Sequence, residues 1–258
     1  MSTPNHNIGQ YQHYFASGHY DRRYPRPNFS VLRLARKLLP PGGRVLDYGC
    51  GSGRYLLELR HQAQECIGFD ICAAALARLN DNLTGLDGSD RITLLGPEAY
   101  QLECYQQQTG PVDLALCLFG VLAHIDTPEK RQKVLKDLVR VLDPVHGRLI
   151  ISVPNRRRRF RKEQRAFRGQ DQIRYTRRFT SGTLELSYRL YDSQSLTQEL
   201  AQAGFSVERL RAESVFPESW LARSAWLARI DHWFCRWLPA DLGYGVLAVA
   251  RPESDGKR

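Results

Sequence analysis

Short apolar runs that are typical of buried strands alternate with segments of helical periodicity from residue 44 to residue 153. The strand-like runs read RVLDYG, ECIGFD, RITLL, VDLALCL and GRLIISV, and the helix-like segments include ICAAALARLNDNL and PEKRQKVLKDLVRVL. Two further strand-like runs, FSVERLRAE and YGVLAVAR, lie nearer the C-terminus. Helices that connect apolar strands in this way cover both faces of a parallel sheet. The pattern therefore predicts an α/β fold with a doubly wound, mostly parallel sheet of seven strands.

Three segments stand apart from this alternation. The length of 258 residues and a hydrophobic content of 42% favour a single domain over residues 1–258. Residues 1–27 form an arm rich in Tyr, His and Arg, and its two late prolines argue against regular structure there. Residues 156–190 form a basic insertion that includes a hairpin pattern, and residues 218–238 are expected to form one Trp-rich helix.

The sequence indicates neither a membrane span nor a disulfide framework nor a metal site. The longest apolar run, LALCLFGVLA, has about half of the roughly 20 residues that a membrane-spanning helix needs. The N-terminus is polar and has no signal-peptide core, and the six cysteines form neither a CxxC pair nor a cluster with histidines. We therefore expect a cytoplasmic protein with reduced cysteines and no bound metal.

A glycine-rich turn follows the first predicted strand in VLDYGCGSGRY. Asp47 ends the strand, and Gly49, Gly51 and Gly53 follow just before a predicted helix. Glycines allow positive φ angles and close approach of a ligand, and the N–H groups at a helix start favour a polar or anionic ligand. Asp70 ends the second predicted strand, where an acidic side chain accepts hydrogen bonds from ribose hydroxyls in doubly wound folds. The turn lacks the G-x-G-x-x-G spacing, which disfavours a nicotinamide dinucleotide.

These segments together resemble the class I S-adenosylmethionine (SAM) dependent methyltransferases over about residues 30–155, and more loosely to about residue 250. The matching motifs are LDYGCGSG, GFDI, VDLALCLFGVLAHI and LVRVLDPVHGRLIISVPN. Their order is also similar to that in bacterial relatives of the tRNA wobble-uridine methyltransferases. The resemblance implies a Rossmann-like methyltransferase fold with an insertion after the fifth strand, and it implies SAM as the cofactor.

By this resemblance, the cofactor site lies at the carboxyl ends of the strands. The residues implied to contact SAM are Asp47, Gly49, Gly51 and Gly53 around its methionine part, Asp70 at the ribose, Ile71 and Glu98 at the adenine, and Leu118 and Phe119 beside the sulfonium. Glu98 departs most from the family pattern. The family often has an acidic residue just after the third strand, whereas here Leu-Gly-Pro precedes the glutamate.

Methyl transfer from a sulfonium requires mainly that the acceptor is aligned with the S–CH₃ bond. A general base is needed only where the acceptor carries a proton that must leave. His124, after the fourth strand, is the candidate base, although a histidine that merely packs against its neighbours fits equally well. Tyr20, Tyr24 and Arg26 in the arm are candidates for closing over SAM or for binding substrate. The chain lacks the motifs of the common nucleobase methyltransferases, Asn/Asp-Pro-Pro-Tyr and Pro-Cys, which disfavours those acceptors.

The net charge of +10 is concentrated in the insertion. Residues 156–178 contain eleven Arg or Lys against two acidic residues, a local charge of +9. This segment follows the fifth strand at the ligand-binding edge of the predicted sheet, so Asn155, Arg156 and Arg157 are candidate substrate-binding residues. They favour an anionic acceptor, either a small metabolite or RNA, whereas the alternative is a solvated charged loop.

The Trp-rich segment, residues 218–238, carries a second indication of a partner. Trp226, Ile230, Trp233 and Trp237 fall on one side of a helix and basic residues on another, as in helices that lie in a membrane interface. The segment therefore indicates peripheral membrane contact. The alternative is a helix that packs over the substrate cleft.

The sequence as a whole predicts a SAM-dependent methyltransferase that acts on an oxygen or nitrogen atom of an anionic substrate. The alternative is a non-catalytic SAM- or nucleotide-binding module that docks RNA through the arginine-rich insertion. Such a module would show RNA affinity with a steep salt dependence and no methylated product. The glycine spacing disfavours an NAD-linked oxidoreductase.

Overall fold

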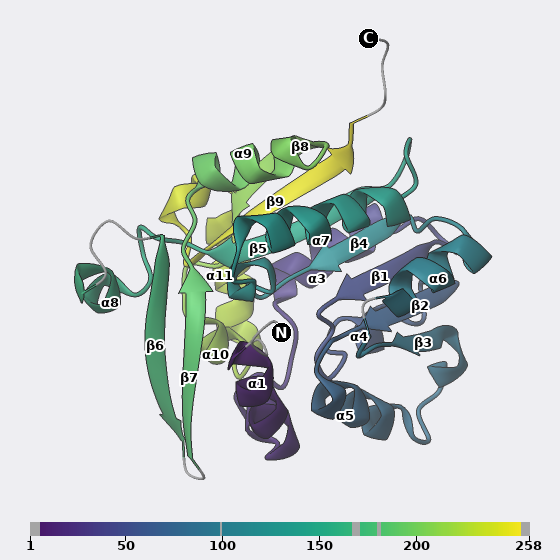
Figure 1. The fold of residues 1–258 in the computed structure, drawn as a ribbon, viewed down its shortest axis with the longest axis horizontal. Coiled ribbons are helices and arrows are strands. Elements are labelled where there is room, and N and C mark those ends of the chain that lie inside the picture. Colours follow the sequence, from purple (N-terminus) through teal and green to yellow (C-terminus); the bar gives the residue numbers. More distant parts are fainter. Residues whose placement is uncertain (1–5, 99, 167–170, 180–181, 254–258) are drawn as a thin grey trace.

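The computed structural model describes residues 6–98, 100–166, 171–179 and 182–253. They form a seven-stranded sheet with helices on both faces and, beside it, a two-stranded hairpin (Figure 1). The strand order in the large sheet is β3-β2-β1-β4-β5-β9-β8. These strands are β1 Arg44–Tyr48, β2 Glu65–Phe69, β3 Ile92–Leu95, β4 Leu114–Cys117, β5 Arg148–Pro154, β8 Phe205–Ala212 and β9 Gly245–Pro252. The predicted α/β fold is confirmed.

Strands β1 to β5 pair in parallel, and β9 runs antiparallel to both of its neighbours, β5 and β8. The carboxyl ends of β1, β2, β4, β5 and β8 therefore reach the same edge of the sheet. The order of the strands reverses between β1 and β4. A doubly wound sheet opens a ligand-binding crevice at such a reversal.

Both faces of the sheet are buried, because successive residues of a strand pack into different cores. The helices that cover the sheet are α3 Phe29–Leu38, α4 Leu56–Leu59, α5 Ala73–Leu83, α6 Tyr100–Thr109, α7 Pro128–Val141 and α9 Ser193–Gln202. Leu46 and Ile67 lie in one core with α7 and α9, whereas Val45 and Cys66 lie in the other with α3, α4 and α5. Burial on both sides explains why the strands read as continuous apolar runs.

The basic insertion contains the predicted hairpin. Helix α8 Arg161–Ala166 precedes the antiparallel strands β6 Gln172–Phe179 and β7 Gly182–Arg189. Apolar side chains of the hairpin are buried, namely Ile173, Tyr175, Leu184, Leu186 and Tyr188. The hairpin stands beside the N-terminal helices (Figure 1). The insertion is therefore part of the hydrophobic core and carries its charges on a folded scaffold.

The N-terminal arm differs from the prediction, because it forms two helices, α1 His6–Ala16 and α2 His19–Arg23. Its two late prolines, Pro25 and Pro27, follow α2 and therefore affect only where that helix ends. The arm bridges the hairpin and α5. Gln12 Oε1 accepts a hydrogen bond from Ala74 N in α5 (2.9 Å), and Asn7 Oδ1 accepts one from the β7 backbone (3.0 Å).

The Trp-rich segment also differs from the prediction, since it forms two helices, α10 Glu218–Leu221 and α11 Ala225–Cys235. The second helix starts at Ser224, whose hydroxyl accepts a hydrogen bond from Leu227 N (3.3 Å) as an N-cap. Among the described residues, no helix has the length and apolar character needed to cross a membrane.

A buried ion pair joins α7 to α9. Arg131 Nε lies 2.6 Å from Glu199 Oε1, and Arg189 Nη1 lies 3.1 Å from Glu199 Oε2. Loss of the carboxylate would leave the buried guanidinium of Arg131, and the mostly buried one of Arg189, without their partner. We expect Glu199→Ala to lower the free energy of unfolding by about 3 kcal/mol or more in chemical denaturation.

The matched control is Glu208→Ala, which removes a more accessible ion pair with Arg148 (2.8 Å). This substitution should cost less than about 1 kcal/mol. Equal losses in the two variants would contradict the assignment of Glu199 as a buried structural charge.

Candidate active site

The glycine turn after β1 is held to the end of β2 by backbone hydrogen bonds to Phe69 O and by one carboxylate. Gly49, Gly51 and Gly53 adopt φ angles of 82°, 56° and 83°, values that favour glycine. Asp70 Oδ2 accepts a hydrogen bond from Gly51 N and Oδ1 accepts one from Cys72 N, both at 2.8 Å. A carboxylate has about four lone-pair sites, so Asp70 keeps acceptor capacity for a ligand hydroxyl. Asp70 therefore both shapes the turn and offers acceptor capacity at its edge.

Two buried carboxyl groups lie at this edge of the sheet, Asp47 in β1 and Asp70 after β2. Burial raises the pKa of Asp47 to about 7. The positive charge of Arg54 opposes this shift, and the neighbouring Asp70 carboxyl adds to it. Burial also raises the pKa of Asp70 to about 6, although its backbone hydrogen bonds oppose the shift. Buried carboxylates fit a ligand with hydroxyl groups and a positive charge. The ribose, ammonium and sulfonium of SAM meet that requirement, so these residues fit the predicted cofactor.

The arm covers the glycine turn. A Cβ atom on Gly51 would lie 3.1 Å from the ring of Phe15. Ser52 Oγ donates to Asp21 Oδ1 (2.5 Å), and Arg54 Nη2 donates to the hydroxyl of Tyr20 (3.1 Å). The side of the turn that would face a ligand therefore lies against α1 and α2. The arm is in a position from which it would close over a bound cofactor.

The other residues implied to contact the cofactor have different surroundings. Ile71 is exposed, and exposed Glu98 accepts a hydrogen bond from Gln101 Nε2 (2.8 Å). Leu118 is buried in the core that contains α3. Phe119 has a φ of 61°, and its N–H donates to a serine hydroxyl in β5 (2.8 Å). That strained backbone turns the Phe119 ring toward the arm.

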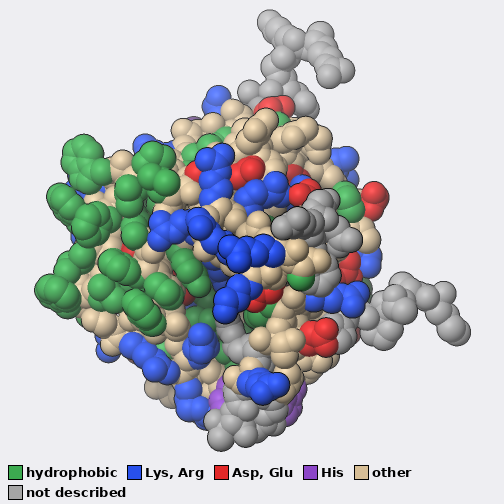
Figure 2. All heavy atoms as spheres, turned by 90° about the vertical axis from the view of Figure 1, so that its left-hand side faces the viewer, with side chains coloured by type: hydrophobic (Ala, Val, Ile, Leu, Met, Phe, Trp, Pro, Cys, Tyr) green, Lys and Arg blue, Asp and Glu red, His purple; other side chains and the backbone are tan. Residues whose placement is uncertain are grey.

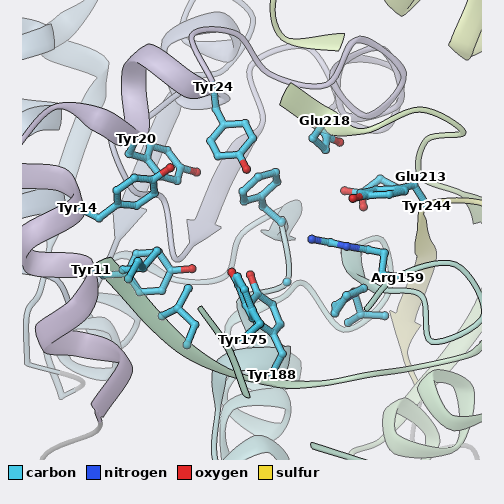
Figure 3. A pocket seen from close by; sticks show the side chains of 16 residues that line it. Tyr11, Tyr14, Tyr20, Tyr24, Arg159, Tyr175, Tyr188, Glu213, Glu218 and Tyr244 are labelled. Atoms are coloured by element: carbon cyan, nitrogen blue, oxygen red, sulfur yellow. The ribbon is translucent and has the colours of Figure 1, made fainter. Parts of the chain in front are cut away.

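A small pocket lined by aromatic side chains, with a cavity volume of about 30 Å³, lies beside Phe119 (Figure 3). The tyrosines in its wall are Tyr11, Tyr14, Tyr20 and Tyr24 of the arm, Tyr175 and Tyr188 of the hairpin, and Tyr244 before β9. The arm, the insertion and the C-terminal segment therefore build this pocket together at the carboxyl edge of the sheet. Tyr20 and Tyr24, predicted from the sequence, are among its lining residues.

Three charged side chains enter the same pocket: Arg159, Glu213 and Glu218 (Figure 3). The Arg159 guanidinium lies 4.8 Å from the ring centroid of Phe160 and 4.7 Å from that of Tyr244. Its buried Nε has no hydrogen-bond partner within the described part of the chain. A buried, unsatisfied donor of a cation is costly unless a ligand completes it. Arg159 therefore keeps a donor in the pocket that a ligand could complete.

The two glutamates form a buried acid pair. Burial raises the pKa of Glu213 to about 8, with a smaller contribution in the same direction from the neighbouring Glu218 carboxyl group. Burial likewise raises the pKa of Glu218, whose Oε1 accepts a hydrogen bond from Asn28 Nδ2 (2.7 Å). Gly245 leaves room for this arrangement, because a Cβ there would lie 2.1 Å from Glu213 Oε2. The pair therefore retains a proton near neutral pH, and Arg159 keeps the pocket from being negative.

His124 lies behind the pocket wall. Its Nε2 is hydrogen-bonded to the hydroxyl of Tyr11 (2.7 Å), and its ring lies 3.9 Å from that of Tyr188 between centroids. Burial lowers the pKa of His124 to about 3. The ring is therefore connected to the pocket through the hydroxyl of Tyr11, which lines it, and its low pKa makes it a weak proton acceptor.

The other predicted substrate-binding residues are engaged elsewhere. Asn155 is buried and donates to the backbone oxygens of Asp241 (2.8 Å) and Gly243 (2.7 Å). Arg156 pairs with Asp171 (2.6 Å), Arg157 lies 3.4 Å from Asp241, and Arg26 is exposed. None of these four side chains lines the tyrosine pocket. Within the ranges that the structure describes, no group of His, Cys, Asp or Glu is suited to hold a metal ion.

The sequence analysis named Arg156 and Arg157, whereas Arg159 of the same run lines the pocket, and it did not name the acid pair. Arg159 is the fourth arginine after β5, and the turn at Phe160 (φ 59°) accompanies its inward position. Glu213 could have been found from one signal. It directly follows β8, and the carboxyl end of that strand lies at the ligand-binding edge of the sheet.

Comparisons with known proteins show the family and the fold of this chain. A family model described as a methyltransferase domain matches residues 18–210. A tRNA (carboxymethyluridine(34)-5-O)-methyltransferase of Arabidopsis thaliana is 29% identical over 137 residues, which span 49% of this chain and 30% of that protein. The chain thus covers less than a third of this relative's length.

Solved structures show the same fold at low sequence identity. The CcbJ methyltransferase from Streptomyces caelestis is 12% identical, with a TM-score of 0.64 over 88% of this chain and 91% of that one. The DhpI-SAM-HEP complex is 15% identical, with a TM-score of 0.63 over 97% of this chain and 100% of that one. The glycopeptide N-methyltransferase MtfA with SAM is 16% identical, with a TM-score of 0.55 over 88% and 95%.

Proposed function

Because this chain belongs to the methyltransferase-domain family, we propose that it transfers a methyl group from SAM to an oxygen or nitrogen atom of an anionic acceptor in the tyrosine pocket. The predictions of a class I methyltransferase and of SAM as its cofactor are confirmed by the family match and by the fold. The acceptor class and the residue roles below are the proposal.

Arg159 carries this proposal. Its buried, unsatisfied Nε in the pocket supports an acceptor whose negative group completes the guanidinium. The pocket begins at Phe119 and Gly120, directly after β4, and so adjoins the edge that bears Asp47 and Asp70. An acceptor bound to Arg159 would therefore lie beside the cofactor.

SAM, when bound, supplies an activated methyl group, and the chain's own residues supply alignment. The tyrosine rings exclude water and restrict how the acceptor lies, which can lower a barrier by about 7 to 11 kcal/mol in a well-aligned site. An ionised acceptor oxygen needs no proton removal. For an acceptor that carries a proton, Glu213 in the pocket would receive it in its ionised form, whose share grows as the pH rises toward and above its raised pKa of about 8.

A carboxymethyl group of a tRNA nucleotide is one acceptor of this kind. The Arabidopsis relative is named for carboxymethyluridine in tRNA. A carboxylate would suit Arg159, and the arginine-rich insertion would suit RNA phosphates. A small carboxylated or phosphorylated metabolite fits Arg159 equally well, so both acceptors belong in the test.

The test is transfer of labelled methyl from SAM into a cell extract that is then separated into RNA, lipid and small-molecule fractions. Label in one fraction, absent with Asp70→Ala protein, would support methyl transfer and identify the acceptor class. Tight SAM binding with no label in any fraction would instead favour the non-catalytic binding module.

SAM binding should strengthen with pH. Burial raises the pKa of Asp47 and Asp70, so between about pH 4 and pH 7 the folded protein holds protons that the unfolded chain has already released. The free energy of unfolding therefore falls as the pH rises through this range. A cationic ligand prefers the ionised carboxylates. We therefore expect SAM affinity to rise about tenfold between pH 6 and pH 8, as one linked proton requires.

Isothermal titration across this range measures the effect. Asp47→Asn removes the titrating carboxyl with little change of shape, and its affinity should vary less with pH. An identical pH profile in wild type and Asp47→Asn would contradict the linkage to Asp47.

A further inference from the structure

All four tryptophans of the chain lie on one exposed surface, which we call the tryptophan face. They are Trp220 of α10, Trp226 and Trp233 of α11, and Trp237 just after it, and each is between 59% and 74% exposed. Exposed Phe234 and Leu242 extend the same surface. Figure 2 shows the resulting cluster of hydrophobic side chains, which occupies one side of the molecule. Exposed apolar patches of this kind mark interaction sites.

The protein holds this face outward. Helix α11 turns Ala228, Asp231 and Cys235 inward and packs against α3. Asp231 Oδ1 accepts hydrogen bonds from Val215 N (2.8 Å) and Phe216 N (3.0 Å), which anchors the helix. No tryptophan lines the tyrosine pocket, although Glu218 of α10, in the same segment, does. The tryptophans are a fixed external surface.

The arginine run lies next to the tryptophan face. Arg158 Nη1 donates to the backbone oxygen of Leu242 (2.9 Å), which joins the run to the end of the apolar surface. Arg156, Arg157, Arg161 and Arg165 line a shallow open hollow. In Figure 2 a band of Lys and Arg side chains crosses the surface beside the hydrophobic cluster.

We propose that the tryptophan face and the adjoining arginines dock onto an anionic membrane surface. Tryptophan favours the membrane–water interface, because its ring is apolar and its N–H stays near water. Neighbouring arginines would meet acidic lipid head groups, each adding about 1 kcal/mol of attraction. This combination of apolar face and flanking positive charge matches a bilayer surface better than a nucleic-acid duplex, which presents phosphates while its bases remain stacked inside. The proposal does not depend on the methyl acceptor.

Tryptophan fluorescence gives a direct test, because every tryptophan of the chain lies on this face. Full-length protein is mixed with vesicles of phosphatidylcholine alone, or of phosphatidylcholine with phosphatidylglycerol. With anionic vesicles the emission should shift to shorter wavelength and be quenched by brominated lipids, and the protein should sediment with them. Equal binding to neutral vesicles, or no shift with either kind, would overturn the proposal.

Two double variants separate the contributions. Trp226→Ala with Trp237→Ala should weaken vesicle binding roughly tenfold or more, with little dependence on salt. Arg161→Gln with Arg165→Gln should weaken it roughly tenfold at low salt and less at high salt. Tyr100→Ala, an exposed aromatic on α6, is the control and should bind as wild type does.

Two other partners are outcomes of the same experiment. If the protein binds tRNA through the tryptophan face and the arginines, and vesicles leave its tryptophan emission unchanged, the proposal is overturned in favour of RNA. Sedimentation that shows a dimer, dissociated by the Trp double variant, together with no vesicle binding, would overturn it in favour of a second copy of this chain.

Discussion

Asp70→Ala is expected to weaken SAM binding at least ~100-fold, because the substitution removes several interactions at once. The carboxylate is the acceptor for Gly51 N and Cys72 N. Without it the glycine turn keeps only the backbone hydrogen bonds that Gly49 N and Cys50 N donate to Phe69 O in β2. The acceptor capacity for ribose hydroxyls is lost from the same place. Isothermal titration with SAM measures the effect.

The matched control for this prediction is Asp87→Ala, which removes an exposed carboxylate from the loop before β3. It should leave SAM affinity unchanged within about twofold, as is usual for surface sites. Thermal unfolding of both variants shows whether the fold is intact. A folded Asp70→Ala protein that binds SAM as wild type does would refute the cofactor site at the ends of β1 and β2.

Arg159→Gln is expected to lower kcat/KM for the acceptor about 100-fold while SAM affinity stays within about twofold of wild type. The substitution keeps hydrogen-bonding capacity but removes the charge that the anionic acceptor would pair with. Its position between the rings of Phe160 and Tyr244 means that no other arginine can replace it without moving the backbone.

Arg158→Gln is the matched control for the acceptor site. Arg158 is the preceding residue of the same run, but it is exposed and donates outward to Leu242 O. Its loss should change kcat/KM for a small acceptor by less than about threefold. If both variants lose activity equally, the insertion acts through its overall charge, and Arg159 has no specific role.

The sequence was sufficient for the features that depend on local pattern. The apolar runs predicted the parallel strands because burial on both faces requires continuous apolar residues. The glycine spacing predicted the turn after β1 because the backbone there needs positive φ angles at Gly49, Gly51 and Gly53. The hairpin of the insertion followed from alternating residues such as Leu184 and Leu186, which are buried.

Features that depend on contacts distant in sequence could not be predicted in the same way. Helix α1 has few aliphatic residues and is stabilised by tertiary contacts, including Asn7 with β7 and Gln12 with α5. The acid pair arises because the segment after β8 folds back over Asn28, nearly two hundred residues earlier in the chain. The choice of Arg159 among adjacent arginines depends on the backbone at Phe160. The sequence alone does not determine which of the adjacent arginines turns inward.

The measurement that tests the central claim most directly is a crystal structure with S-adenosylhomocysteine. The account predicts that the ribose hydroxyls contact Asp70 and that the sulfur faces the tyrosine pocket beside Phe119, with Arg159 on the opposite wall. A product bound with its sulfur turned away from this pocket, or separated from Arg159 by the protein, would contradict the proposed acceptor site.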